Sequence, residues 1–565
     1  MSRRLPATAL LLARTARHLR PAQVAHRVRL RAQQAAFARF PTVLERALEA
    51  PSPPAGAAWP AGFAPLDGQD VGDAAPAADA YAAGRFTFLA EERTLTTPTG
   101  AWDWEQAQAL RLWRFHLHGF EWAWAFAAHP DRAMASSLLG DVLRSWTAGT
   151  AVGRGDAWAP YVVSLRAWAL CGLHGPLLAG TDIGAGTAAA LAVHARFLRS
   201  HLELDVGGNH LVKNLKALIG LGVFLDEVDV VDTAAARLAT ELPRQVLEDG
   251  GHFELSPSYH CQVLGDLVDV GGLLAAAGRP PVEGLEGAVA SMRSWLGAML
   301  LPDGDVPLFN DGGPVDHRRI ALLAPTRAAA GPTAPGITLL PASGHAVVRA
   351  GPLLLVADVG LPCPPELPAH AHADCLSFQL AVDGRLVVAD TGTSTYAAGA
   401  RRDHERSTAA HSTVEVDGED QTEVWGAFRA ARRAHPHLER AGLDADGTAV
   451  VMAWHDGYER LRGRPRHRRT WRITAGAVEI VDQVDGDGEH RCVARLILAP
   501  GTPVEQLGDG RFRAGPVEVL LAGGRASQEQ VEVAPDFGRL VPATCLRLQA
   551  DGPLPHRLVT TITTG

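Results

Sequence analysis

Two histidines and an aspartate occupy alternate positions in the segment HAHAD, which begins at His370. Alternate side chains of an extended strand share one face, so we expect His370, His372 and Asp374 to point the same way, with small alanines between them. Imidazole can transfer protons near neutral pH, and imidazole together with carboxylate can bind a metal ion. This segment is therefore the first candidate for a catalytic or metal-binding site.

Further groups of the same kind follow in the next expected strands. The Asp383-Gly384 step suits a tight hairpin turn, Asp390 ends the second strand of that hairpin, and His411 follows in STAAHSTV. A histidine, an aspartate and a second histidine on separate strands suit zinc, because three protein ligands leave a fourth position free. Strand-end histidines that only bind neighbouring carboxylates would give the same pattern, so the spacing alone leaves both interpretations open.

The elements that must position these groups change type along the chain. Between about residues 105 and 300, apolar and aromatic residues recur at helical spacing, as in WEQAQALRLWRFHLHGF. After APTRAAAGPTAPG the pattern changes to short alternating runs separated by Gly/Asp turns, which is typical of an antiparallel β domain. Helices first and strands second predict an α+β chain of two packed domains, with their boundary near residues 325–335.

The composition is consistent with a large folded enzyme. A chain of 565 residues exceeds what one hydrophobic core usually serves, so at least two domains are expected. The formal net charge of −9, and the lack of a basic motif interleaved with aromatics, argue against a nucleic-acid partner. Six scattered cysteines without a CxxC pair indicate neither a disulfide framework nor a thiolate zinc site.

The first 80 residues differ from the rest. Nine arginines and no acidic residue lie between Arg3 and Arg39, which predicts either a basic helix on an anionic membrane or partner, or a solvated helix packed on the protein body. The apolar run from Leu5 to Ala13 is short for a signal peptide, and no run approaches the ~18 apolar residues that span a bilayer. Residues 51–80, rich in Pro, Ala and Gly, predict a loosely ordered linker or surface excursion.

The segments HAHADCLSFQLAVDGR and RSTAAHSTVEVDGEDQ resemble the C-terminal β domain of the heparinase II/III-like family of polysaccharide lyases. Upstream, GNHLVKNLK and SPSYH resemble the Asn-His and Tyr-His pairs of the family's helical domain, here Asn209-His210 and Tyr259-His260. Weaker similarities extend the resemblance over residues 100–440: LRLWRFHLHGF, WAPYVVSLRAW and PDGDVPLFNDGG.

The resemblance implies an N-terminal α/α-toroid, an incomplete barrel of helical hairpins, followed by a C-terminal antiparallel β-sandwich, with the active cleft between them. We therefore expect a basic N-terminal helical segment over residues 1–50 and the linker over 51–80. The toroid, as the catalytic domain, is expected over residues 81–330, and the β-sandwich over 335–565.

The reaction that the resemblance implies is β-elimination at a uronic acid of an acidic polysaccharide. The proton at C5 is removed, the bond between C4 and its oxygen breaks, and an unsaturated sugar remains. An enolate-like charge develops at the carboxylate, and the amide of Asn209 matches the family position that damps such charge. A helix cap is the alternative for Asn209, because Gly207 and Gly208 precede it and an apolar helical segment follows.

The proton transfers fall to Tyr259, whose hydroxyl can donate or accept, provided that neighbouring groups make its phenolate reachable from an ordinary pKa of ~10. His210, His260 and His370 could supply that setting, and His370 or His210 could act as a second group where the C5 hydrogen and the C4 oxygen lie on opposite ring faces. The alternative for Tyr259 is a buried aromatic residue with a satisfied hydroxyl.

A further set of side chains is expected to bind the substrate: Trp158, Arg166, Lys213, Glu254 and His260. Only two of the 53 basic residues are lysines, and a helix would align Lys213 and Lys216 with Asn209 on one face. Lys213 could then lie near an anionic substrate, although chance or an ion pair with neighbours on the same helix is the preferred interpretation.

The resemblance also implies that His372, Asp390 and His411 bind zinc while His370 faces the substrate. The metal would then mainly brace the loops of the β domain. A zinc-dependent hydrolase is one alternative, but it would leave the Asn-His and Tyr-His pairs without a role. This chain has HSTV where the family commonly shows HNTV, which retains His411 and changes its support.

The rival from another class is a noncatalytic glycan-binding or exopolysaccharide-assembly protein that has kept the fold. The joint presence of Asn209, Tyr259 and His370 argues against it. The substrate could be heparan sulfate, alginate, hyaluronan or another bacterial exopolysaccharide. An acidic glycan without heavy sulfation is preferred, because the few lysines and scattered arginines form no obvious sulfate-binding cluster.

Overall fold

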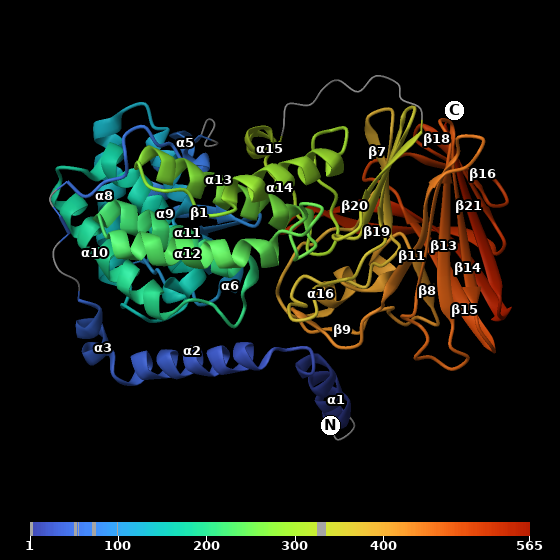
Figure 1. Ribbon diagram of the computed structural model, residues 1–565, viewed down its shortest axis with the longest axis horizontal. Helices are drawn as coiled ribbons and strands as arrows, with labels where there is room; N and C mark the ends of the chain where they lie inside the picture. The colour runs from blue at the N-terminus through green and yellow to red at the C-terminus, as the bar shows by residue number, and fades with distance from the viewer. Residues whose placement is uncertain are drawn as a thin grey trace. The chain divides into compact units, whose positions relative to one another are not determined.

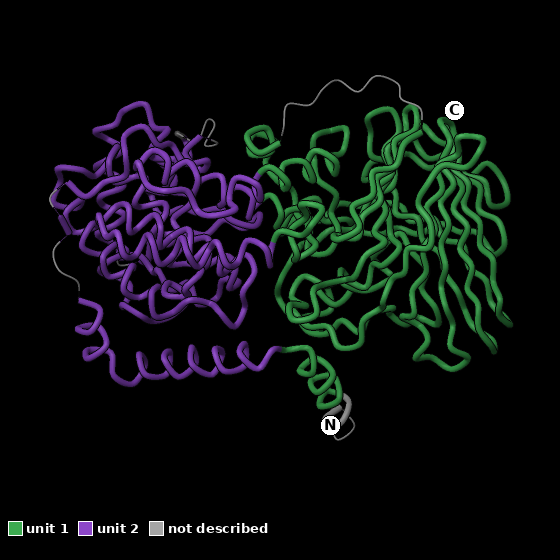
Figure 2. The backbone as a smooth tube through the Cα atoms, in the orientation of Figure 1, with its two compact units in different colours: residues 1–19, 246–261, 290–565 green, residues 20–245, 262–289 purple. Residues whose placement is uncertain are grey.

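The computed structural model describes residues 4–49, 53–54, 56–69, 75–98, 100–324 and 335–564. The chain divides into two compact units (Figures 1 and 2). Unit 1 contains residues 1–19, 246–261 and 290–565, and unit 2 contains residues 20–245 and 262–289.

The described residues of unit 2 are helical apart from one small hairpin of β1 (Arg85–Phe88) and β2 (Glu91–Thr94). Its helices begin with α2 (Pro21–Arg39), α3 (Pro41–Leu48), α4 (Leu66–Gln69), α5 (Ala75–Ala82), α6 (Arg111–Gly119), η1 (Glu121–Ala123), α7 (Trp124–Ala127) and α8 (Arg132–Gly149). They continue with η2 (Asp156–Trp158), α9 (Pro160–Leu173), η3 (His174–Leu178), α10 (Asp182–Ser200), α11 (Gly208–Leu225) and α12 (Val228–Gln245).

The helices α9 and α11 form the centre of unit 2. Each is apolar around most of its circumference and buried along nearly its whole length, which is the pattern of an interior helix. They pack against each other, and α12 and α10 pack against α11. The outer helices α8 and α10 begin at side-chain caps, since Asp131 accepts from the Met134 amide and Thr181 from the Gly184 amide.

The segment expected to be a loose linker instead packs on this helical core. The Trp59 indole donates to the Gly220 carbonyl at 2.8 Å and contacts the Trp168 ring at 4.5 Å. The Leu66 amide donates to the Asp269 carboxylate. Residues 51–52, 55 and 70–74 of the expected linker lie outside the described residues. A high content of Pro, Ala and Gly predicts a linker, but composition does not show that Trp59 anchors the segment to the helices.

Unit 1 contains α1 (Arg4–Ala16), α15 (His317–Leu323), α16 (Ala400–Glu405), η4 (Thr408–Ala410) and the antiparallel sheets (Figure 1). A five-stranded sheet has the order β3 (Gly336–Leu340), β4 (His345–Ala350), β5 (Leu353–Asp358), β6 (Phe378–Val382), β7 (Arg385–Val388). A four-stranded sheet has the order β19 (Arg525–Asp536), β20 (Arg539–Pro553), β15 (Glu489–Ile497), β8 (Val414–Val416). A small pair is formed by β9 (Val424–Trp425) and β10 (Arg429–Ala430).

The largest sheet has eight strands, in the order β11 (Pro436–Leu443), β12 (Ala449–His455), β13 (Arg466–Ile473), β14 (Ala477–Asp485), β21 (His556–Thr564), β18 (Val517–Ala522), β17 (Arg511–Ala514), β16 (Val504–Gly508). Strands β13 and β14 alternate buried and partly exposed residues, so one face of this sheet lies on the core. Trp471 and Ile480 share that core with Leu355 of the five-stranded sheet and Leu548 of the four-stranded sheet. The sheets therefore form an antiparallel β-sandwich.

Two helices contain residues of both units: α13 (Pro257–Ala276) and α14 (Leu285–Met299). Trp295 and Met299 of α14 pack on Val347 and Val356 of the five-stranded sheet, whose β5 is buried on both faces. This packing explains why residues from 290 onward group with the strands, although the change from helix to strand lies between Leu323 and Gly336. Most of the boundary expected at residues 325–335 lies outside the described residues.

The expected hairpin after the HAHAD segment is confirmed. Strands β6 and β7 pair antiparallel, and Asp383 and Gly384 both have positive φ, at 48° and 79°. The HAHAD segment itself was wrongly expected to be a strand, because residues 370–374 form an irregular loop before β6. In the described part of the chain, no helix is both long and apolar enough to cross a membrane.

Candidate active site

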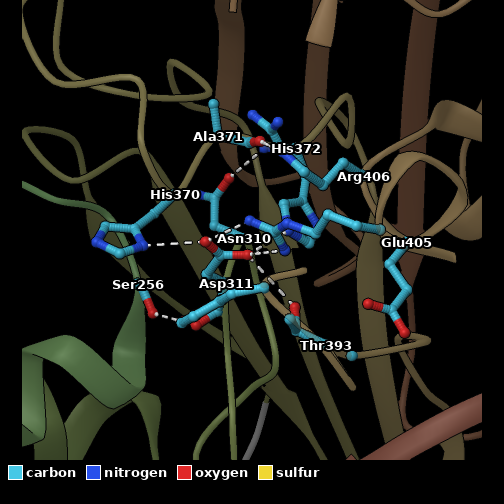
Figure 3. Close-up of polar contacts among 12 residues, drawn as sticks. Ser256, Asn310, Asp311, His370, Ala371, His372, Thr393, Glu405 and Arg406 are labelled. Atoms are coloured by element: carbon cyan, nitrogen blue, oxygen red, sulfur yellow. Dashed lines mark hydrogen bonds and ion pairs between the residues drawn. The ribbon is translucent and has the colours of Figure 1, made fainter. Parts of the chain in front are cut away.

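The buried carboxylate of Asp311 organises the polar cluster in unit 1 (Figure 3). It accepts hydrogen bonds from His370 Nδ1 at 3.0 Å and from His372 Nε2 at 2.9 Å. The Arg402 guanidinium donates to both carboxylate oxygens, with Nη2 at 2.8 Å from Oδ2. Burial raises the pKa of Asp311, but Arg402 and the two histidine hydrogen bonds outweigh burial and hold it well below its ordinary value. Asp311 is therefore an ionised acceptor.

The loop that carries Asp311 is locked to the HAHAD loop through its backbone. The His372 amide donates to Asn310 Oδ1 at 3.0 Å, and the Asp311 amide donates to the His370 carbonyl at 3.2 Å. Asn310 has φ of 57°, a left-handed conformation that asparagine tolerates better than most residues. The FNDG sequence therefore serves a geometric purpose, because it turns the chain so that both side chains reach the loop of the two histidines.

The rings of Tyr259 and His370, two candidates for proton transfer, are in contact. Their ring centroids are 4.0 Å apart with an interplanar angle of 34°. Tyr259 lies in the first turn of α13, and the Asp311 carboxylate fixes the His370 proton on Nδ1. A neutral His370 consequently has its lone pair on Nε2, which lies 3.7 Å from Glu254 Oε2. Of the expected substrate-binding residues, Glu254 thus lies beside the catalytic candidates.

Sequence reasoning missed Tyr396, whose hydroxyl is 2.9 Å from that of Tyr259. Its ring contacts the Arg402 guanidinium at 5.0 Å. Burial and the neighbouring Tyr259 raise the pKa of Tyr396 well above its ordinary value, so Tyr396 stays a neutral phenol. The available signal was its place shortly after TGTST, within the region of resemblance, but nothing in its local pattern distinguishes it from a core tyrosine.

Asn209 and His210 lie in unit 2, at the start of α11. The N-cap of this helix is Gly207, with φ of 70°, so Asn209 occupies the first turn and is not the cap. His210 Nδ1 lies 3.0 Å from Glu203 Oε1, and its ring packs on Tyr161 at 4.4 Å between centroids. The Tyr161 hydroxyl in turn accepts from Gln262 at 2.8 Å.

Lys213 forms a buried ion pair, but its partner lies on another helix and is not a neighbour on α11. Its ammonium lies 2.7 Å from Asp266 Oδ1, and Lys216 lies 2.9 Å from the same oxygen and 2.6 Å from Asp269 Oδ2. Burial lowers the pKa of Lys213, but Asp266 outweighs burial, and the net shift is upward. Asp266 lies on α13, so this pair connects two helices and leaves Lys213 unsuited to bind substrate.

The expectation that Trp158, Arg166 and His260 bind substrate is corrected by their burial. Arg166 donates to the carbonyls of His118 and Ala157 at 2.9 and 2.8 Å, and its guanidinium also contacts the Trp158 ring. His260 accepts from the His252 amide, contacts the Met292 carbonyl, and stacks on Trp295 at 4.2 Å. These side chains hold helices and loops together, and their polar groups face protein.

His372 and His411, two of the three expected zinc ligands, have one buried ring nitrogen each without a hydrogen-bond partner among the described residues: His372 Nδ1 and His411 Nε2. Their rings are 5.3 Å apart. The other nitrogen of each ring binds a carboxylate, Asp311 for His372 and Asp390 for His411. Such an outer carboxylate is typical of a metal-bound histidine.

Asp390 does not complete a set of three ligands in this geometry. Its Oδ2 lies 2.8 Å from His411 Nδ1, and its Oδ1 accepts from the Gly392 amide. The described residues contain no group of three or more His, Cys, Asp or Glu side chains arranged to hold a metal ion. The two histidines fit a metal, whereas Asp390 is placed to orient His411.

Two family models match the sequence. The model described as heparinase II/III-like, C-terminal, matches residues 332–552, and that described as heparinase II/III N-terminus matches residues 186–327. Among curated proteins, FtsZ-localized protein C of Caulobacter vibrioides is 31% identical over 245 residues, which are 41% of this chain. The match covers only 40% of that relative's length.

Solved structures share the fold at low sequence identity. Heparinase III superposes with a TM-score of 0.72 at 17% identity over 96% of this chain and 92% of the other. Heparan sulfate lyase HepC from Pedobacter heparinus gives 0.57 at 17% identity, over 95% and 88%. Chondroitin AC lyase from Streptomyces coelicolor A3 gives 0.53 at 16%, over 88% and 79%. These likenesses establish the α/α-toroid followed by a β-sandwich.

Proposed function

Because the chain belongs to the heparinase II/III-like family, we propose that it is a polysaccharide lyase that cleaves a uronic-acid-containing glycan by β-elimination. The observation that carries this proposal is the contact between Tyr259 and His370, with the imidazole held in one tautomer by Asp311. Where the C5 hydrogen and the C4 oxygen lie on opposite faces of the sugar ring, proton removal and proton donation need two such groups within reach of it.

In the proposed reaction, one of these two groups takes the C5 proton, a double bond forms between C4 and C5, and the bond from C4 to the glycosidic oxygen breaks. The departing oxygen receives a proton from Tyr259. A neutral Tyr396 can donate its hydroxyl proton to the Tyr259 oxygen, which would stabilise a Tyr259 phenolate. Asp311 keeps His370 oriented through all steps of the proposed reaction.

The developing charge on the uronate carboxylate needs a donor, and we assign this role to Asn209, with His210 beside it. Asn209 lies in the first turn of α11, where backbone N–H groups and the helix dipole favour an anion. A zinc ion held by His372 and His411 would add a brace between their loops, and it has no part in moving protons here. Glycans with little sulfate are the preferred substrates, since Lys213 and Arg166 are engaged within the protein.

The test is to incubate the purified protein with heparan sulfate, alginate, hyaluronan and bacterial exopolysaccharides and to record the ultraviolet absorbance of an unsaturated product. Tyr259→Phe should reduce turnover by ~100-fold to 10,000-fold, because it removes only the hydroxyl. Tyr81→Phe is the matched control, since Tyr81 lies in unit 2 and stacks on Phe86. Equal activity of both variants would assign proton transfer to another residue.

A noncatalytic role is the second candidate, and one observation favours it. The 31% identical relative is called FtsZ-localized protein C, a name that describes a location rather than a reaction. Under this alternative the fold would bind a glycan or a partner without cleaving it. Glycan binding without unsaturated product across the whole panel, by wild type and Tyr259→Phe alike, would support this candidate and contradict the lyase.

A further inference from the structure

Helix α2 has an inner face that packs on unit 2. This face consists of residues spaced three or four apart, with Leu30 and Phe37 buried: Gln23, His26, Leu30, Gln33 and Phe37. The Phe37 ring contacts Phe197 and His201, and the Gln33 amide donates to the Ser200 carbonyl. The orientation of α2 about its own axis is therefore fixed.

The opposite face of α2 is a stripe of valine, alanine and arginine. Its members occur at i, i+4, i+7, i+11 and i+15 and are all exposed: Val24, Val28, Arg31, Ala35 and Arg39. Val24 is 49% exposed and Val28 is 63% exposed. Phe40 and Val43, which follow at the start of α3, are 57% and 67% exposed. We call these seven residues the outer face.

Large exposed apolar side chains are concentrated in this part of the chain. Among the described residues, 17 such side chains are exposed, and four of them belong to the outer face: Val24, Val28, Phe40 and Val43. Scattered single apolar residues on a surface need no explanation, whereas a cluster of them points to an interaction site.

The charge of the same region is opposite to that of the rest of the protein. Residues 1–44 contain nine arginines and no acidic residue, so their formal charge is +9. The whole chain carries −9, and the remaining residues therefore carry −18. Arg14 and Arg27 pair with Glu423 and Asp205, while Arg31 and Arg39 form no ion pair in the described part of the chain.

We propose that the outer face binds the surface of an anionic lipid bilayer. Its valines and Phe40 would enter the boundary between headgroups and acyl chains, and its arginines would extend their charged ends to lipid phosphates. A helix of 19 residues is about 28 Å long and can lie along such a surface. The proposal is independent of the lyase function, because it uses none of the residues of that site.

Two other occupants fit the outer face less well. A symmetric contact with a second copy would place Arg31 and Arg39 against the same arginines, which repel each other. An acidic protein segment would match the charge, but the convex side of a single helix offers no groove for its backbone or side chains. A bilayer needs no groove, and it satisfies the valines and the arginines together.

The test is cosedimentation of the full-length protein with vesicles of phosphatidylcholine alone or with added phosphatidylglycerol. We expect binding only to the anionic vesicles, and release by salt, because each arginine near such a surface strengthens binding roughly fivefold and is screened by ions. Arg31→Gln/Arg39→Gln should therefore weaken binding about 25-fold. Arg525→Gln/Arg539→Gln, two exposed arginines of unit 1, is the control with the same net charge.

The apolar contribution has its own variant, Val24→Ser/Val28→Ser, which should also weaken binding. Circular dichroism should show the fold unchanged in all variants, since every substituted side chain is exposed. The proposal is overturned if the wild type binds no anionic vesicle at low salt, or if the outer-face and control variants bind equally. It is also overturned if soluble polyglutamate binds the outer face and no vesicle does, because this result would identify an acidic protein partner.

Discussion

Replacing Asp311 with Asn tests the centre of the candidate site, because this substitution keeps the side-chain shape and removes the charge. Arg402 is fully buried and donates to both oxygens of Asp311. In Asp311→Asn its guanidinium would remain buried without that counterion. Breaking a buried ion pair on one side costs about 3–5 kcal/mol of the free energy of unfolding, a large part of the roughly 5–15 kcal/mol of a native domain.

The double variant Asp311→Asn/Arg402→Met separates this cost from the catalytic role of the carboxylate. Removing both charges leaves no unpaired ion, so the double variant should regain most of the lost stability. Turnover should not recover, because His370 still lacks the ionised acceptor on Nδ1 that fixes its tautomer. We expect both variants to lose at least ~100-fold in kcat.

Urea unfolding followed by circular dichroism measures the stability without any substrate, and product absorbance measures turnover. A free energy of unfolding within about 1 kcal/mol of wild type for Asp311→Asn would refute the buried ion pair as a stability determinant. A double variant as unstable as the single one would mean that the histidine hydrogen bonds, and not Arg402, carry the energy. Recovery of turnover in the double variant would show that Asp311 is not needed to position His370.

Three further predictions follow from other parts of the structure. Asn209→Ala should lower kcat more than it weakens ground-state binding, because it removes about 3–4 kcal/mol of transition-state stabilisation. Weaker substrate binding with an unchanged kcat would reduce Asn209 to a binding residue. His372→Ala should lose a stoichiometric zinc and lower the melting temperature, as measured by metal analysis and calorimetry, and a wild-type protein that contains no metal would end the zinc hypothesis. Burial raises the pKa of Asp482, but Arg469 and the hydrogen bonds of Arg469 and His467 outweigh burial and lower it to about 2. This folded-state pKa lies below the unfolded value of ~3.9, so about 2.6 kcal/mol of stability is present above pH ~4 and is lost as the pH falls toward and below 2. Asp482→Asn should flatten this acidic limb when the free energy of unfolding in urea is plotted against pH.

The sequence predicted the fold where its signals are local. The helical spacing, the alternation in β13 and β14 and the Asp383-Gly384 turn depend on neighbours in the chain, and they were read correctly. The Asp311 cluster depends on contacts across 59 residues to His370 and 91 residues to Arg402. No periodicity reports such contacts, so Asp311, Arg402 and Tyr396 were not predicted as site residues.

Besides contacts between distant residues, resemblance to a motif does not show whether a side chain is buried. Arg166 was expected to bind substrate because it lies in a segment of resemblance, and the structure places it inside unit 2. The sequence PYVVSLRAWALCGL contained the necessary signal. A helix that is apolar all round is an interior helix, so its one arginine must find its partners within the protein.

The division into units separates the candidate residues into one group in unit 1 and Asn209 in unit 2. Glu254, Tyr259, Asp311 and His370 come from both sides of the change from helix to strand, yet all of them belong to unit 1. The packing of α14 on the five-stranded sheet brings the 246–261 and 302–313 segments into the same unit as the HAHAD loop. The two residues of the proposed proton-transfer pair therefore lie in one compact unit, and catalytic groups are positioned most precisely when a single scaffold carries them. Asn209 belongs to unit 2, so its substitution should change turnover while the Tyr259–His370 contact and the stability of unit 1 stay as they are.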